Sequence, residues 1–226
     1  MSLNFFTRCL KENKKIKNSD LAKLSWGNYS CIDKNNGLVY IKPSGVDLDA
    51  INENDISVVD LEGNQLSGMN CSVDTQIHLS LYKNFEEITS ICHTHSTYAT
   101  AFSQAGKDIN MYGTTHADVF PSAIRVITPP SEIYQKKDHE KLLGEFISNS
   151  LKPFKNNQAV LVKYHGPFVW STNFSAVDIA IALEEISRMA YLTETLGCTK
   201  SLPCEISNLH WERKNGEGKW YGQNRH

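Results

Sequence analysis

The chain has 226 residues, 40% of them hydrophobic, which is enough to fill the core of one ordinary domain without disulfides or a partner. Its 23 Lys and Arg residues against 25 Asp and Glu residues give a net charge of −2, so no overall basic field exists to gather nucleic acid or an anionic membrane. No apolar run approaches the roughly 20 residues that span a bilayer, and the first residues lack a signal-peptide pattern. We therefore expect a cytoplasmic protein with a single domain over residues 1–226, and six free, buried cysteines.

Helix and strand signals alternate along the first half of the chain. Apolar residues at helical spacing predict a short helix over Phe5–Glu12. A second helix is expected from Asp74-Thr75, where Asp is a good N-cap, to about Phe85. Runs of β-branched and aromatic residues predict strands over Leu38–Ile41, Ile56–Leu61 and Ile88–His95.

The second half of the chain continues the mixed pattern. Val160-Leu161-Val162 predicts a buried strand that ends at the breaker His165-Gly166-Pro167. Apolar residues at helical spacing predict a long helix from Ser175 that Gly197 stops. The polar region Pro129–Lys155 is helix-prone only over Glu140–Ile147. Elements in this order indicate an α/β or α+β domain, whose strand order the sequence leaves open.

The pair His93 and His95 is the sharpest chemical feature. Side chains at i and i+2 of a strand point to the same face, so the two imidazoles are expected side by side, as in a metal site. Two polar residues on an exposed strand face explain the pair equally well.

Two further positions favour the metal site. His165 sits at a strand end, and Asp74 at a helix start. Three imidazoles with an oxygen ligand or a water suit Zn²⁺, Mn²⁺ or Co²⁺ in an open catalytic site. Taken alone, His165 is an ordinary strand-end histidine.

Other polar clusters have both a functional and an ordinary explanation. The run Gly113-Thr114-Thr115-His116-Ala117-Asp118 offers a general base but is typical of a hydrogen-bonded turn. Three short segments offer hydroxyls and backbone N–H groups for a phosphate, and singly each is an ordinary turn: Gly27-Asn28, Ser44-Gly45 and Cys71-Ser72-Val73. The aromatic end of the chain, Gly218–Gln223, is either an anchoring tail or a source of a proton donor, Tyr221.

In this order, the clusters resemble the L-ribulose-5-phosphate 4-epimerase branch of the class II aldolase/epimerase family. The resemblance covers nearly the whole chain. It rests on Leu24-Ser25-Trp26-Gly27-Asn28, Ile41-Lys42-Pro43-Ser44-Gly45-Val46, Ser72-Val73-Asp74-Thr75, His93-Thr94-His95-Ser96, Gly113-Thr114-Thr115-His116-Ala117-Asp118, His165-Gly166-Pro167-Phe168-Val169-Trp170, Glu184-Glu185 and Tyr221-Gly222-Gln223.

The resemblance implies a three-layer α/β/α domain with a central, mainly antiparallel sheet, in a homotetramer whose active sites lie between subunits. Its C-terminal tail, about residues 205–226, would contribute to the active site. One divalent metal per subunit, Zn²⁺ above Mn²⁺ or Co²⁺, would be bound by His93, His95 and His165, with Asp74 as a further ligand. The phosphate of a sugar phosphate would be held by Gly27, Asn28, Ser44, Gly45, Ser72 and the backbone of Val73. Asp118 and Tyr221 would be the acid/base pair, at least one of them supplied by a neighbouring subunit.

The implied reaction interconverts L-ribulose 5-phosphate and D-xylulose 5-phosphate. It cleaves the C3–C4 bond by a retro-aldol step and re-adds the rotated aldehyde, with the metal stabilising the enediolate charge. A class II aldolase acting on a substrate such as L-fuculose 1-phosphate is the nearest alternative, although such enzymes place a glutamate where this chain has Asp74 and lack the Tyr-Gly-Gln ending. A non-catalytic module like the adducin head would have lost metal ligands, whereas all three histidines are present.

Two departures from the family pattern stand out. Val73 occupies a position where the family usually has a second serine, so one hydroxyl is lost while the backbone N–H remains, and we expect weaker phosphate binding. Pro129–Lys155 matches the family poorly.

Overall fold

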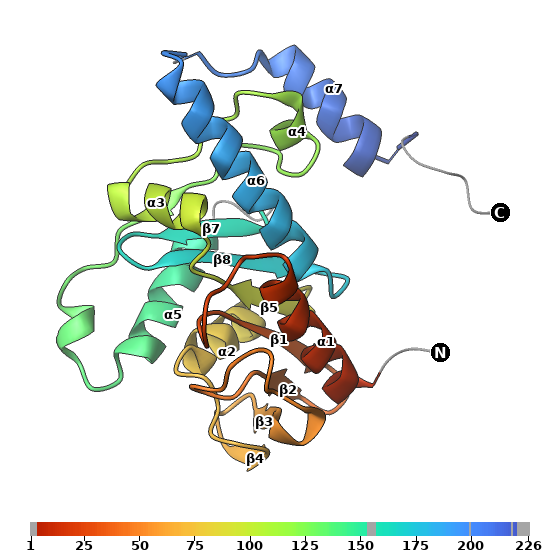
Figure 1. Ribbon diagram of the computed structural model, residues 1–226, viewed down its shortest axis with the longest axis vertical. Coiled ribbons are helices and arrows are strands. Elements are labelled where there is room, and N and C mark those ends of the chain that lie inside the picture. Colours follow the sequence, from red (N-terminus) through yellow and green to blue (C-terminus); the bar gives the residue numbers. More distant parts are fainter. Residues whose placement is uncertain (1–3, 153–156, 199, 218, 221–226) are drawn as a thin grey trace.

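A computed structural model describes residues 4–152, 157–198, 200–217 and 219–220 (Figure 1). Its centre is an eight-stranded sheet in the order β4-β3-β2-β1-β5-β8-β7-β6. Every neighbouring pair is antiparallel except β6 and β7, which are parallel. The strands are β1 Asn28–Asp33, β2 Leu38–Ile41, β3 Ser57–Asp60, β4 Gln65–Ser67, β5 Ser90–His93, β6 Val126–Ile127, β7 Ala159–Val162 and β8 Gly166–Ser171.

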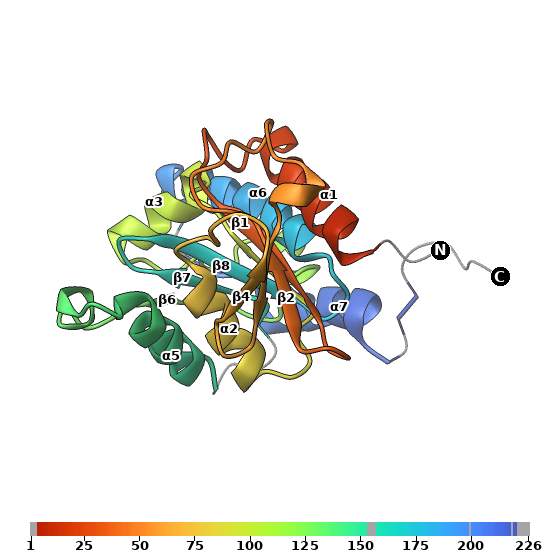
Figure 2. The ribbon, with the colours of Figure 1, turned by 90° about the horizontal axis from the view of Figure 1, so that it is seen from below.

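Helices cover both faces of the sheet (Figure 2). In that view α1, α3 and α6 lie above the sheet, and α2 and α5 lie below it. The α-helices are α1 Phe5–Asn18, α2 Thr75–Asn84, α3 Thr97–Ala105, α4 Thr114–Ala117, α5 His139–Leu151, α6 Ala176–Thr195 and α7 Cys204–Asn215, with 3-10 turns at Glu53–Asp55 and Ile133–Gln135. The predicted three-layer α/β/α architecture with a mainly antiparallel sheet is confirmed.

The alternation of side chains along the strands divides the core into two apolar clusters. Tyr29, Cys31 and Cys92 belong to the cluster that includes residues of α1, α3 and α6. Their neighbours on the opposite face, Ile91 and Phe168 among them, pack with residues of α2 and α5. All six cysteines are free, but only Cys9, Cys31 and Cys92 are buried, so the expectation of six buried thiols is wrong: Cys71 is half-buried, and Cys198 and Cys204 are exposed.

Several elements differ in extent from the sequence expectation. The first helix continues to Asn18 because Ile16 is buried and Asn13 donates to the carbonyl oxygens of Cys9 (2.8 Å) and Tyr29 (3.1 Å). Strand β5 stops at His93, two residues early, and the predicted breaker at Gly166 begins β8. The segment before Asp118, expected as a turn, contains the short helix α4. None of the described helices combines the length and the apolar composition that a membrane-spanning helix requires.

Candidate active site

Three histidine rings converge where β5 ends. The Nε2 atoms of His93 and His95 are 3.0 Å apart, and the ligand atoms of His93, His95 and His165 all lie within 4.8 Å of one another. A tetrahedral Zn²⁺ with Zn–N distances of about 2.0–2.1 Å separates its nitrogen ligands by roughly 3.3 Å. The spacing of the three rings therefore fits a single divalent metal ion.

The surroundings of His93 select its ligand nitrogen. Nδ1 of His93 lies 2.9 Å from the carbonyl oxygen of Pro167, to which it donates. The ring also stacks on Phe168, its partner across the β5–β8 ladder, with centroids 4.2 Å apart and planes 16° apart. With the proton held on Nδ1, the lone pair of Nε2 points to the other two histidines, an arrangement typical of metal-binding imidazoles.

The environment of the three rings lowers their pKa values and so favours the neutral imidazoles. Burial lowers the pKa of His93 well below its ordinary value, and His165 and His95 lower it further. Burial also lowers the pKa of His95 and of His165, while the nearby carboxylate of Asp74 opposes the shift at both. Because neutral imidazole is the form that binds metal, the site needs little proton release to accept an ion.

Loops, not strands, carry the second and third histidines. His95 lies past the end of β5, just before α3, whose first N–H groups are capped by Glu184 from α6: Glu184 accepts from Tyr98 N at 2.8 Å and Ala99 N at 3.0 Å. His165 lies in the tight turn between β7 and β8, next to Tyr164 in the left-handed region (φ 66°). Glu184 thus accounts structurally for part of the Glu184-Glu185 motif.

One cavity of about 280 Å³ joins the histidines to the predicted phosphate segments. The loops after β2 and before α2 meet there, since Ser44 N donates to Asn70 O at 2.8 Å and Pro43 bridges to Cys71. The cavity is lined by Ser25, Trp26, Gly27, Asn28, Lys42, Ser44, Gly45, Ser72, Val73, Asp74, His95 and His165. Every residue expected to hold the phosphate is therefore in the same cavity as Asp74 and two of the three histidines.

Asn28 ties the phosphate segments to Asp74. Its Nδ2 donates to Asp74 Oδ2 at 2.7 Å and to Ser72 Oγ at 3.2 Å, and Asn28 pairs with His93 across the β1–β5 ladder. Asp74 is the N-cap residue of α2, but its side chain makes no cap hydrogen bond, because it is turned toward Asn28. Asn28 Oδ1 is buried without a protein partner among the described residues, so an acceptor remains for a bound molecule.

Lys42 is a cavity residue that the sequence reasoning did not single out. It is only 2% exposed, and its Nζ donates to Ser25 O at 3.0 Å and Pro43 O at 3.2 Å. Burial lowers the pKa of Lys42, whereas Asp47 and Asp74 act in the opposite direction. A buried lysine costs free energy unless it meets negative charge, and Asp47 and Asp74 supply part of that charge here. Its position at the end of the apolar strand β2 was the available sequence signal.

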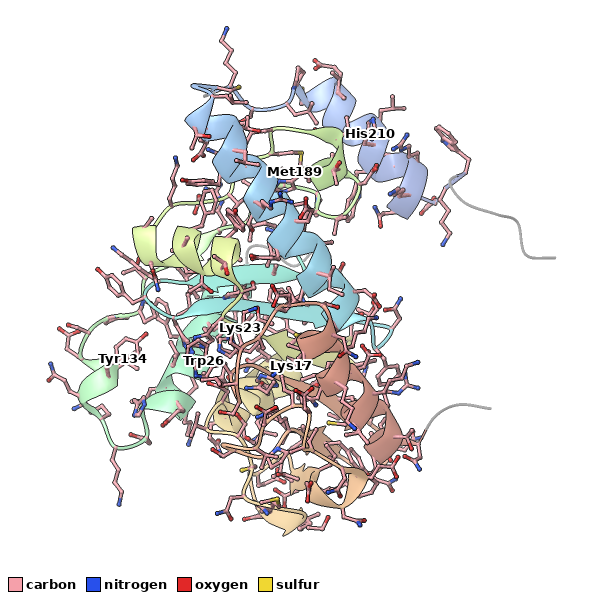
Figure 3. All side chains as sticks on the ribbon, in the orientation of Figure 1. Lys17, Lys23, Trp26, Tyr134, Met189 and His210 are labelled. Atoms are coloured by element: carbon pink, nitrogen blue, oxygen red, sulfur yellow. The ribbon has the colours of Figure 1, made fainter. Side chains whose placement is uncertain are left out.

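Asp118, one of the two predicted acid/base residues, does not line this cavity in its own chain. Asp118 follows α4 and is bound by α7: His210 Nδ1 lies 3.0 Å from Oδ1, and Arg213 and Lys214 reach Oδ2 at 3.0 and 3.2 Å. Partial burial raises the pKa of Asp118, but the hydrogen bonds from Arg213, His210 and Lys214 outweigh it and leave the pKa lowered. In Figure 3, His210 on α7 lies far from the cavity residue Trp26. Tyr221 lies outside the described residues.

Known proteins resemble this chain in sequence and in fold. The chain is 36% identical over 216 residues to the L-ribulose-5-phosphate 4-epimerase UlaF of Salmonella paratyphi B, covering 93% of this chain and 95% of that protein. The structure of an L-fuculose 1-phosphate aldolase superposes with a TM-score of 0.79 at 27% identity, covering 94% of this chain and 97% of the other. The L-fuculose-1-phosphate aldolase of Thermus thermophilus, at 19% identity, shares the fold with a TM-score of 0.70, covering 88% of this chain and 100% of the other. A family model described as class II aldolase and adducin N-terminal domain matches residues 8–191, and the chain belongs to that family.

Proposed function

We propose that the protein is a metal-dependent epimerase that interconverts L-ribulose 5-phosphate and D-xylulose 5-phosphate by retro-aldol cleavage and re-addition. The observation that carries this proposal is the cavity that places His95 and His165, two members of the three-histidine cluster, beside the residues expected to hold the phosphate. The similarity to curated L-ribulose-5-phosphate 4-epimerases over 93% of the chain supports the choice of substrate. A charged sugar phosphate does not cross membranes, so this function also favours the cytoplasm.

In this proposal His93, His95 and His165 hold one divalent metal, Zn²⁺ before Mn²⁺ or Co²⁺, with Asp74 close by. A metal in that position supplies Lewis-acid stabilisation of the negative charge that develops on substrate oxygens when the C3–C4 bond breaks. His93 is held for this task by the Pro167 carbonyl and Phe168.

The substrate phosphate is assigned to the other end of the cavity. Gly27, Ser44, Gly45 and Ser72 offer hydroxyl and backbone donors there, together with the Val73 backbone N–H, and Asn28 joins them to Asp74. Lys42 adds the one buried positive charge among the described lining residues. Binding the phosphate at a fixed distance from the histidines places C3 and C4 within reach of the metal site.

Proton transfer is assigned to Asp118 and Tyr221. One group must take the proton of the C4 hydroxyl, and a second must protonate the alkoxide that forms on the opposite face. Asp118 lies outside the cavity of its own chain, which supports a homotetramer in which a neighbouring subunit supplies one of the pair, with the tail of about residues 205–226 near the site.

The subunit arrangement can be tested by complementation. We expect hybrids assembled from Asp118→Asn and Tyr221→Phe chains to recover activity, because some of their sites combine an intact Asp118 with an intact Tyr221 of another chain. Each variant assembled alone is the control. Hybrids as inactive as both parents would show that one chain supplies both groups.

Product analysis separates the proposal from the nearest alternative. Purified protein is incubated with L-ribulose 5-phosphate and Mn²⁺ or Zn²⁺, with His95→Ala as the control, and the products are identified. D-xylulose 5-phosphate is the expected product. Accumulation of glycolaldehyde phosphate and dihydroxyacetone would instead indicate an aldolase, the alternative that the fuculose-phosphate aldolase structure supports. No turnover of the substrate with either metal would refute the epimerase.

A further inference from the structure

A buried polar cluster behind the cavity links α2 to β1. His78 on α2 is fully buried, and its Nδ1 lies 2.7 Å from Ser30 Oγ on β1. The same hydroxyl oxygen lies 2.8 Å from the hydroxyl of Tyr82, one turn further along α2. None of the three side chains lines the cavity with the histidines. The cluster therefore has no place in substrate or metal binding as described so far.

Burying this polar cluster in an apolar layer costs free energy. His78 lies in the layer between α2 and the sheet, and its Nε2 has no partner among the described residues. Buried polar atoms are normally satisfied, and an apolar side chain at this position would leave no orphaned atom. Burial lowers the pKa of His78 to about 4, so the ring is neutral at pH 7 and acts through shape and hydrogen bonding. Packing alone therefore does not explain a polar side chain at position 78.

The location of the cluster, next to Asn28 and Asp74, explains the histidine. His78 lies one helical turn after Asp74, and Ser30 lies two residues after Asn28 on the same face of β1. The Ser30–His78 bond therefore runs beside the Asn28–Asp74 bond and joins the same two elements. Two hydrogen bonds side by side prevent α2 from sliding or rotating against β1, whereas a single hydrogen bond would allow rotation.

His78 also stands behind the first metal-site histidine. The His78 ring meets Phe168 edge to face, with centroids 6.1 Å apart and planes 76° apart. The same Phe168 ring stacks on His93, with centroids 4.2 Å apart. Phe168 is thus held between His78 and His93, and a smaller or more mobile side chain at position 78 loosens the wall on which the His93 ring rests.

We propose that His78 is a positioning residue, which holds Asp74 against Asn28 through its bond to Ser30 and supports the His93 ring through Phe168. This inference rests on the proposed function, in which His93 and Asp74 belong to the metal site. Residues that orient metal ligands typically change metal affinity by roughly 10- to 100-fold when they are replaced.

The test measures Co²⁺ binding by the metal-free full chain, followed by the visible absorption of the bound ion and independent of turnover. We expect His78→Leu and Ser30→Ala to raise the Co²⁺ dissociation constant roughly 10-fold. His78→Asn should lose less affinity than His78→Leu, because the Asn amide can take the place of Nδ1 beside Ser30 and only the ring contact with Phe168 is lost. The matched control is Leu81→Ala, which removes buried packing from the same helix without touching the polar cluster, and we expect its affinity to stay within about 2-fold.

Each outcome decides one of the two proposals. Wild-type affinity in both His78→Leu and Ser30→Ala, or an equal loss in Leu81→Ala, overturns the positioning role and leaves the metal site standing. A wild-type chain that binds no Co²⁺, or that binds it equally well after His95→Ala, overturns the proposed function and the positioning role together. If His78→Leu does not fold, Ser30→Ala decides, since it leaves the ring in place and removes only the tie to β1.

Discussion

Replacing Gly27 by Ala tests how closely the segment that carries Asn28 must approach β5. Gly27 has φ +74°, and a Cβ at this position would lie 3.0 Å from the carbonyl oxygen of His93 and 3.5 Å from the Cα of Thr94. Both atoms belong to the backbone, so they cannot rotate away, and the segment must shift by a few tenths of an ångström. The 2.7 Å bond from Asn28 to Asp74 begins at the next residue, so the shift reaches the cavity directly.

The expected magnitude has two parts. The left-handed conformation costs an L-residue about 1–2 kcal/mol, which should appear as a lower free energy of unfolding in urea. A weakened hydrogen bond to a charged group costs about 1.5–3 kcal/mol, so the KM for the sugar phosphate should rise about 10-fold or more. Gly37→Ala is the matched control. It has φ +66° in the turn between β1 and β2, with nothing within 4 Å of the added Cβ.

Urea unfolding and steady-state kinetics on both variants separate strain from displacement. Gly37→Ala should lose comparable stability at an unchanged KM, whereas Gly27→Ala should lose stability and raise KM. A KM for Gly27→Ala no higher than that of Gly37→Ala would show that the close approach to His93 does not hold Asn28 in place. Equal stability of Gly37→Ala and the wild type would refute the strain argument.

Three further predictions concern the metal, the phosphate and acid stability. His95→Ala should give a chain with an unchanged far-UV circular dichroism spectrum but no turnover; activity that survives in the metal-free variant would contradict the assignment. Val73→Ser should lower the KM about 2- to 10-fold, because a hydroxyl at this exposed cavity position adds a hydrogen bond of about 0.5–1.5 kcal/mol, and an unchanged KM would mean that the phosphate does not reach it. Burial lowers the pKa of His116 to about 4, so the stability that its neutral ring contributes is present above pH 6.5 and is lost toward pH 4. Because of this group, the free energy of unfolding in urea should be about 2 kcal/mol lower at pH 5 than at pH 7. His116→Gln should reduce this dependence on pH, and an equal pH dependence in the variant and the wild type would rule out a contribution from His116.

Local sequence patterns determined several helices and strands of this protein and the faces on which their side chains lie. The helix start at Asp74 and the helical spacing of apolar residues before Gly197 follow from rules that act over a few residues. His93 and His95 are close because they are two residues apart, although His95 lies past the end of β5. Those rules also explain why Tyr29 and Cys31 face one layer of helices while Ser30 faces the other. The order of the motifs also indicates the family and the cavity residues expected to hold the phosphate.

Only the tertiary structure decided which distant segments meet. The chain returns to His93 through β8, a strand that the sequence reads as a breaker, and this return brings His165 to a histidine pair 70 residues earlier. The burial of Lys42 and the ion cluster that α7 builds around Asp118 are likewise invisible in local spacing. The physical reason is that pairing, burial and electrostatic environment depend on contacts between segments far apart in sequence, whereas spacing determines only the face on which a side chain lies.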